Sequence, residues 1–106
     1  MMTEFQKTID SVTGYKANRQ KYADEVLANP ELFLELILLC FQALNKNHSK
    51  ACWVLELVCY EKLEWLQEHL DFFSSNIKNL TDESALRSIS KVCWLLTISH
   101  FKKKEI

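Results

Sequence analysis

The stretch "SKACWVLELVCY", residues 49–60, returns later in the chain as "SKVCWLLTISHF", residues 90–101. The copies lie 41 positions apart and share Ser, Lys, Cys, Trp and Leu at equivalent positions. In both copies the apolar residues recur with the 3.6-residue period of an α-helix rather than with the alternation of a strand. The repeat therefore predicts two α-helices of one design.

Each copy carries apolar residues on two opposed sides of its helix. At 100° per residue, one stripe of the first copy consists of Ala51, Cys52, Leu55, Val58 and Cys59. A second stripe, nearly opposite, consists of Trp53, Leu57 and Tyr60. In the helix that contains the second copy, the first stripe consists of Ala85, Ile89, Val92, Cys93 and Leu96. The second stripe consists of Trp94, Ile98 and Phe101. A helix that is apolar on two sides needs neighbours on both, so we expect both copies to be sandwiched.

The composition predicts a single all-α domain over residues 1–106. The chain is 48% hydrophobic and 25% charged, and its one Gly and one Pro allow few sharp turns. The periodicity predicts six helices, over residues 3–13, 15–28, 30–44, 48–61, 63–79 and 82–103, with a bend near residues 68–70. Gly14 is expected to end the first helix, Asn29 to cap the third, and Thr81 or Asp82 to cap the last.

The charge pattern disfavours a nucleic-acid or membrane surface. The net charge is −1, with basic and acidic residues interleaved, so no field of one sign is expected. The most apolar run, residues 32–44, is short and contains Glu35 and Gln42, and the N-terminus lacks the apolar segment of a signal peptide. We therefore expect a cytoplasmic protein whose four cysteines are reduced.

The 41-residue self-match, with two antiparallel helices per unit, resembles the α-solenoids of the HEAT and armadillo repeat families. The stretch "NLTDESALRSISKVCWLL", residues 79–96, resembles the entry to the second helix of a HEAT-like unit, through Asp82, Leu86, Arg87 and Ser90. The first copy lacks such an Arg. The resemblance extends to short bacterial HEAT-like proteins of unassigned role, some of which are named adenylosuccinate lyase.

This resemblance implies an α-α superhelix of about six helices stacked as antiparallel pairs. Helix 15–28 would pair with 30–44 and helix 48–61 with 63–79, which leaves the last pair incomplete. The flexible loop of adenylosuccinate lyases is rich in Ser and contains Gly and Met, and a chain with one Gly has nothing like it. We therefore expect this chain to lack the lyase motifs, even though some of the proteins it resembles carry the lyase name.

The residues that could carry catalysis or bind a metal or cofactor have simpler structural roles. His48 and Cys59 share a stripe but lie about 16 Å apart along a helix, too far to ligate one ion. Cys93 and His100 are two turns apart, about 10 Å, which rules out a thiolate–imidazole pair within that helix. His69 and the carboxylates Glu64 and Glu68 are expected on solvated helix faces. We expect no catalytic, metal or cofactor site.

The predicted function is a non-catalytic protein-interaction or scaffold module. The last helix lacks an expected neighbour, and exposed apolar surface of this size indicates a partner, a homodimer or a longer solenoid. The expected contact surface is Lys91, Trp94, Leu95, Ile98 and Phe101. The alternative is a nucleic-acid-binding protein that resembles HEAT-like DNA alkylation-repair glycosylases, with a basic edge formed by Lys78, Arg87, Lys91, Lys102, Lys103 and Lys104.

Overall fold

The computed structural model describes the backbone of residues 3–104 and the side chains of residues 3–100. Within that range the regular structure is entirely helical, as the composition predicts. The helices are α1 (Glu4–Asp10), α2 (Lys16–Ala28), α3 (Leu32–Cys40), α4 (His48–Gln67), α5 (Leu70–Asn76), the 3₁₀ helix η1 (Ile77–Asn79) and α6 (Glu83–Lys104). None of the helices in the described part is both long and apolar enough to cross a membrane.

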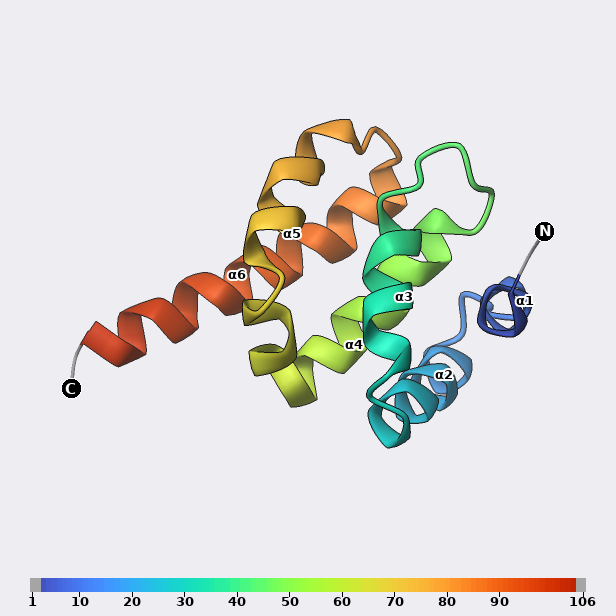
Figure 1. The fold of residues 1–106 in the computed structure, drawn as a ribbon, viewed down its shortest axis with the longest axis horizontal. Coiled ribbons are helices and arrows are strands. Elements are labelled where there is room, and N and C mark those ends of the chain that lie inside the picture. The colour runs from blue at the N-terminus through green and yellow to red at the C-terminus, as the bar shows by residue number, and fades with distance from the viewer. Residues whose placement is uncertain (1–2, 105–106) are drawn as a thin grey trace.

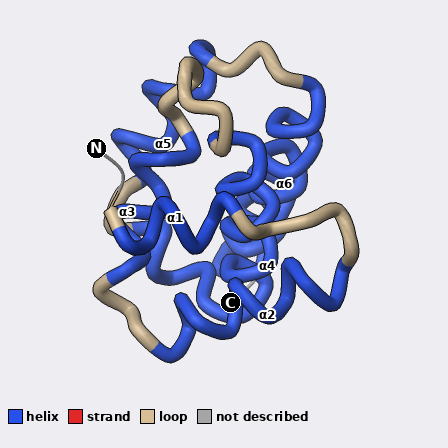
Figure 2. Tube along the Cα trace, turned by 90° about the vertical axis from the view of Figure 1, so that its right-hand side faces the viewer, coloured by secondary structure: helices blue, strands red, loops and turns tan. Residues whose placement is uncertain are grey.

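The helices form two layers, and α4 belongs to one of them. In Figure 2, α1, α3 and α5 lie on one side and α2, α4 and α6 on the other. Helix α4 packs against α2, α3 and α6, and α1 packs against α3 and α4. The first stripe of α4, which includes Cys52, Leu55 and Val58, is fully buried. The expectation that the first copy of the repeat is sandwiched is confirmed.

Helix α3 runs antiparallel to α4. The rings of Phe33 and Trp65 are 5.5 Å apart, and near the other end the Cys52 thiol donates to the Cys40 carbonyl at 3.7 Å. Helix α5 lies beside α3, because the Phe41 and Phe73 rings meet edge to face at 5.7 Å. Helix α6 packs against α4 rather than mainly against α5. The stacking of the helices as antiparallel pairs, with an incomplete last pair, stays a prediction.

Helix α6 runs parallel to α4, but the two copies of the repeat are out of register (Figure 1). Trp53 Nε1 donates to Ser84 Oγ at 2.7 Å, and Lys91 Nζ lies 3.5 Å from Glu56 Oε2. These partners are 31 and 35 positions apart, whereas the sequence repeat is 41. Helix α6 is thus displaced along α4 by 6 to 10 residues, or about 9–15 Å. Its C-terminal turns extend beyond every other element in Figure 1.

The displacement gives the two repeated tryptophans different surroundings. Trp53 is half-buried between α2 and α6, whereas Trp94 is 64% exposed. The expectation that the second copy is sandwiched on both sides does not hold at Trp94. Trp94 lies one turn beyond Lys91 along α6, where its side chain is mostly exposed.

Helix α4 is longer than predicted and carries a kink. Lys62 has non-helical dihedral angles, φ −134° and ψ 56°, at the residue where the sequence predicts a break between two helices. The helix continues to Gln67 because Trp65 packs on α3 and Leu66 is buried. The chain then bends at Glu68 and His69, within the predicted segment, and the expected helix 63–79 is divided there.

Three helix ends differ in detail from the prediction. The first helix stops at Asp10, and Gly14 lies in the following loop without a positive φ, so it is not a left-handed cap. The Asn29 side chain donates to the Glu25 carbonyl at 2.9 Å, which caps the end of α2 instead of the start of α3. At α6 the prediction is confirmed, because Asp82 Oδ1 accepts from the Ala85 backbone N–H at 2.8 Å.

Candidate functional site

The second apolar stripe of α4 forms the floor of a groove. This groove, of about 350 Å³, has α2 on one side and α6 on the other, and its lining residues are Lys16, Arg19, Glu56, Leu57, Tyr60 and Lys91. Helices α2 and α6 cover this stripe only in part: Trp53 and Leu57 are half-buried and Tyr60 is exposed. Of the two stripes predicted from the sequence, the first therefore lies in the core and the second lies at the groove.

Glu56 is the one carboxylate among the described residues that line the groove, and it is only 7% exposed. Its Oε2 accepts from the Tyr60 hydroxyl at 3.0 Å and lies 3.5 Å from Lys91 Nζ. A buried carboxylate is stable only with such partners. Burial, together with the hydrogen bond to Glu56 and its charge, raises the pKa of Tyr60.

Trp53 fixes the position of Arg19. The Arg19 guanidinium carbon lies 4.4 Å from the centroid of the Trp53 ring, while the indole N–H donates to Ser84. This cation–π contact and the hydrogen bond join α2, α4 and α6 through one side chain. Arg19 Nε is buried and has no hydrogen-bond partner within the described residues. The guanidinium is thus held against the ring by stacking.

The groove carries an excess of positive charge. Three cations line it against the single carboxylate of Glu56, which is paired with Lys91. Among residues 3–100, whose side chains are described, neither Lys16 nor Arg19 forms an ion pair. The groove therefore favours an anionic ligand group.

The contact surface predicted from the sequence begins at this groove. Lys91 lines it, Trp94 is largely exposed, and Leu95 and Ile98 are half-buried. The Phe101 side chain lies outside the described residues. The structure thus brings Lys91 and Trp94 to one exposed edge, whereas Leu95 and Ile98 are only partly accessible.

Tyr60 and Trp94 lie at one level along the two parallel helices. They are 34 positions apart, within the 31 to 35 positions that separate the observed contacts of α4 and α6. Trp94 is one turn after Lys91 on the same face of α6, and Tyr60 is one turn after Glu56 on α4. Tyr60 lines the groove and is 52% exposed, whereas Trp94 is not among the described residues that line it and is 64% exposed.

The groove residues Lys16, Arg19, Glu56 and Tyr60 were missed as site residues by the sequence analysis. Tyr60 and Trp53 were identified as a stripe, but the stripe was assigned to the core. Glu56 carried a signal, because it is a carboxylate within the repeated apolar helix where the second copy has Thr97. No signal connected Lys16 and Arg19 to residues more than thirty positions away.

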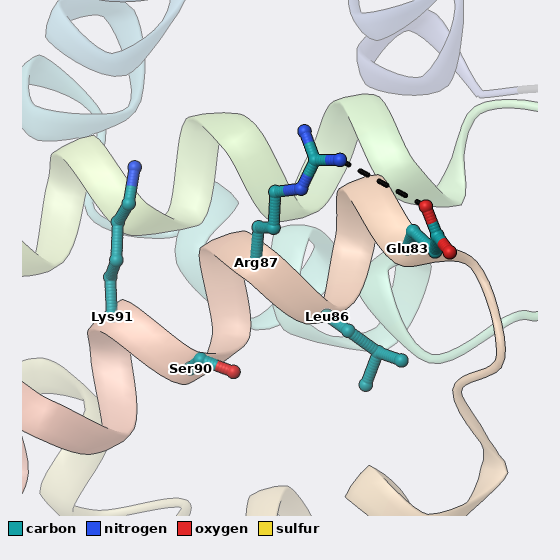
Figure 3. A pocket seen from close by; sticks show the side chains of 5 residues that line it. All are labelled: Glu83, Leu86, Arg87, Ser90 and Lys91. Carbon is teal, nitrogen blue, oxygen red and sulfur yellow. Dashed lines mark ion pairs between the residues drawn. The ribbon is translucent and has the colours of Figure 1, made fainter.

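A second, shallower hollow of about 420 Å³ lies on α6, lined by Glu83, Leu86, Arg87, Ser90 and Lys91 (Figure 3). Arg87 and Lys91 point the same way from α6, and Leu86 points away from them. Arg87 pairs with Glu83 at 3.9 Å, and Lys91 pairs with Glu56. Both cations of this part of the expected basic edge are thus matched by carboxylates. The side chains of Lys102, Lys103 and Lys104 lie outside the described residues.

The thiols and histidines are placed away from the groove. All four cysteines are free, and Cys40, Cys52 and Cys59 are buried. Burial raises the pKa of the Cys59 thiol to about 12 and that of Cys40 well above its usual value, so neither is an activated nucleophile. Within the described residues, no cluster of three or more His, Cys, Asp or Glu side chains could hold a metal ion. His48 Nδ1 lies 3.1 Å from the Asn45 carbonyl.

No protein-family model, curated protein or solved structure matches this chain.

Proposed function

We propose that this chain is a non-catalytic protein-interaction module, a small cytoplasmic HEAT-like α-solenoid that binds a partner protein along α4 and α6. The observation that carries the proposal is the exposure of two aromatic side chains on the packed helices α4 and α6: Tyr60, which lines the groove, and Trp94, one turn beyond the groove residue Lys91. Tyr, Trp and Arg are the residues most enriched among the energetically important contacts of protein interfaces.

The two-layer arrangement supports a scaffold role. The α2, α4 and α6 layer presents the groove, and the α1, α3 and α5 layer covers its back. Contacts made by Trp53 and Glu56 tie the three groove helices together. A partner would therefore bind a surface that is already ordered, which reduces the entropic cost of association.

The interaction is tested with three forms of the full chain as bait: wild type, Trp94→Ala and Leu34→Ala. Leu34 is an exposed apolar residue of α3 in the other layer, so its variant controls for loss of apolar surface. Each captured protein is purified and its Kd for the three forms is measured. We expect Trp94→Ala to raise the Kd about ten-fold or more and Leu34→Ala to change it less than about two-fold.

Sedimentation of the three forms identifies self-association. A dimer that Trp94→Ala dissociates and Leu34→Ala does not would make the second copy the occupant, and would also support an interaction module. The proposal is overturned if every captured protein binds the three forms equally, or if duplex DNA alone binds and depends on Trp94.

A further inference from the structure

We infer that the groove between α2 and α6 receives an acidic segment of the partner, with carboxylates against Lys16 and Arg19 and apolar side chains toward Trp94. This inference rests on the proposed function, because it names the chemistry of the partner at the same surface. It starts from charge: Glu56 matches Lys91, and the two cations of α2 have no carboxylate partner within the described residues.

Two of the three cations are placed before a partner arrives. The Arg19 guanidinium carbon lies 4.4 Å from the centroid of the Trp53 ring, and Lys91 Nζ lies 3.5 Å from Glu56 Oε2. A guanidinium of fixed orientation presents paired N–H donors that match the two oxygens of a carboxylate. Little side-chain entropy is then lost when an anionic group binds.

The apolar part of the surface distinguishes a peptide segment from a free anion. Leu57 and Tyr60 line the groove with Glu56, and the exposed ring of Trp94 lies one turn beyond the groove residue Lys91 on α6. An isolated anion would use the cations alone and leave these rings in water. A segment that alternates acidic and apolar side chains would contact both parts.

The inference is tested with two fluorescein-labelled peptides of equal length. One repeats Glu-Glu-Leu-Ala three times, and the other has Gln in place of every Glu. Fluorescence anisotropy measures their binding to wild type, Lys16→Glu and Lys7→Glu. Lys7 is an exposed residue of α1 in the other layer, so Lys7→Glu makes the same charge reversal away from the groove.

We expect the acidic peptide to bind wild type and Lys7→Glu with equal Kd, and Lys16→Glu to weaken binding about ten-fold or more. The Gln peptide should bind as weakly as the acidic peptide binds Lys16→Glu, and added salt should raise the Kd of the acidic peptide. Circular dichroism melting of both variants verifies that they are folded, since both lysines are exposed.

Several results would overturn the inference: equal binding of the two peptides, equal weakening by the two charge reversals, no binding of the acidic peptide, or its displacement by inorganic phosphate alone. Duplex DNA that binds wild type and is lost with Lys16→Glu would replace the acidic segment with nucleic acid. If the acidic peptide fails while a partner still depends on Trp94, the proposed function stands and only the acidic chemistry is wrong.

Discussion

Lys91 Nζ lies 3.5 Å from Glu56 Oε2 and joins the two long parallel helices across the rim of the groove. The Glu56 side chain is nearly buried, whereas the Lys91 side chain is mostly exposed. A second ion pair on the described part of α6, Arg87 with Glu83, has both side chains exposed. Loss of the cation would therefore leave a nearly buried carboxylate at Glu56 but an exposed one at Glu83.

Replacing Lys91 should destabilise the protein more than replacing Arg87. Lys91→Met leaves the buried Glu56 carboxylate with the Tyr60 hydroxyl as its hydrogen-bond donor, and we expect the free energy of unfolding to fall by about 1–2 kcal/mol. Arg87→Met removes an exposed pair and should change it by less than about 0.5 kcal/mol. Urea unfolding of the two variants checks this prediction, and equal losses would contradict it.

Tyr60 should titrate above the ordinary phenol pKa of 10.0. Because burial and Glu56 raise its pKa in the folded state, Tyr60 stabilises the fold below the unfolded-state pKa. That contribution is lost as the pH rises through the folded-state value. The difference in absorbance near 295 nm between wild type and Tyr60→Phe isolates this phenol. Glu56→Gln, which removes the charge, should lower the midpoint, and an unchanged midpoint would contradict the assigned cause.

Cys93 should be the first thiol to react in the folded protein. It is half-buried, whereas Cys40, Cys52 and Cys59 are buried. Burial also raises the pKa of Cys93, so the reaction should be slower than that of a free thiol. An aromatic disulfide reagent should modify one thiol in native buffer and four in denaturant. Cys93→Ser should abolish the native reaction, and a persistent fast phase in that variant would count against the buried positions of the others.

The repeated tryptophans should differ in their contributions to stability. Trp53→Phe removes the hydrogen bond to Ser84 and weakens the stacking with Arg19, and we expect it to cost about 1–2 kcal/mol. Trp94→Phe changes an exposed ring and should cost less than about 0.5 kcal/mol. Thermal unfolding monitored by circular dichroism compares them, and similar losses would be inconsistent with the observed displacement of α6.

Gly14→Ala should stabilise the protein by about 0.4–1 kcal/mol, because Ala restricts the unfolded chain more than Gly does. Gly14 does not have a positive φ, and an added Cβ would lie 4.0 Å from Arg19 Nη2, an ordinary contact distance. Urea unfolding of the variant measures the gain. A loss of stability would show that the loop requires the freedom of glycine.

The helices and the two stripes of α4 were predictable because they depend on residues close together in the sequence. The 3.6-residue period of Cys52, Leu55 and Val58 marks a buried face without knowledge of the neighbours. The cap at Asp82 was predictable for the same reason, since its partner is three residues away.

The displacement of α6 and the groove were not predictable from the repeat. The register of α6 depends on contacts between unlike positions, Trp53 with Ser84 and Glu56 with Lys91. The groove depends on Arg19 reaching Trp53 from 34 positions earlier in the chain. Such contacts follow from packing between layers, which a repeated motif within single helices does not specify.

The slide of α6 along α4 has a consequence for how this sequence can change over time. The indole of Trp53 joins three helices, so its replacement disturbs all three at once. Trp94 is mostly exposed, so substitutions at this position would leave the fold in place. A duplicated helix shifted along its twin thus separates a tryptophan that maintains the architecture from one whose side chain is open to change.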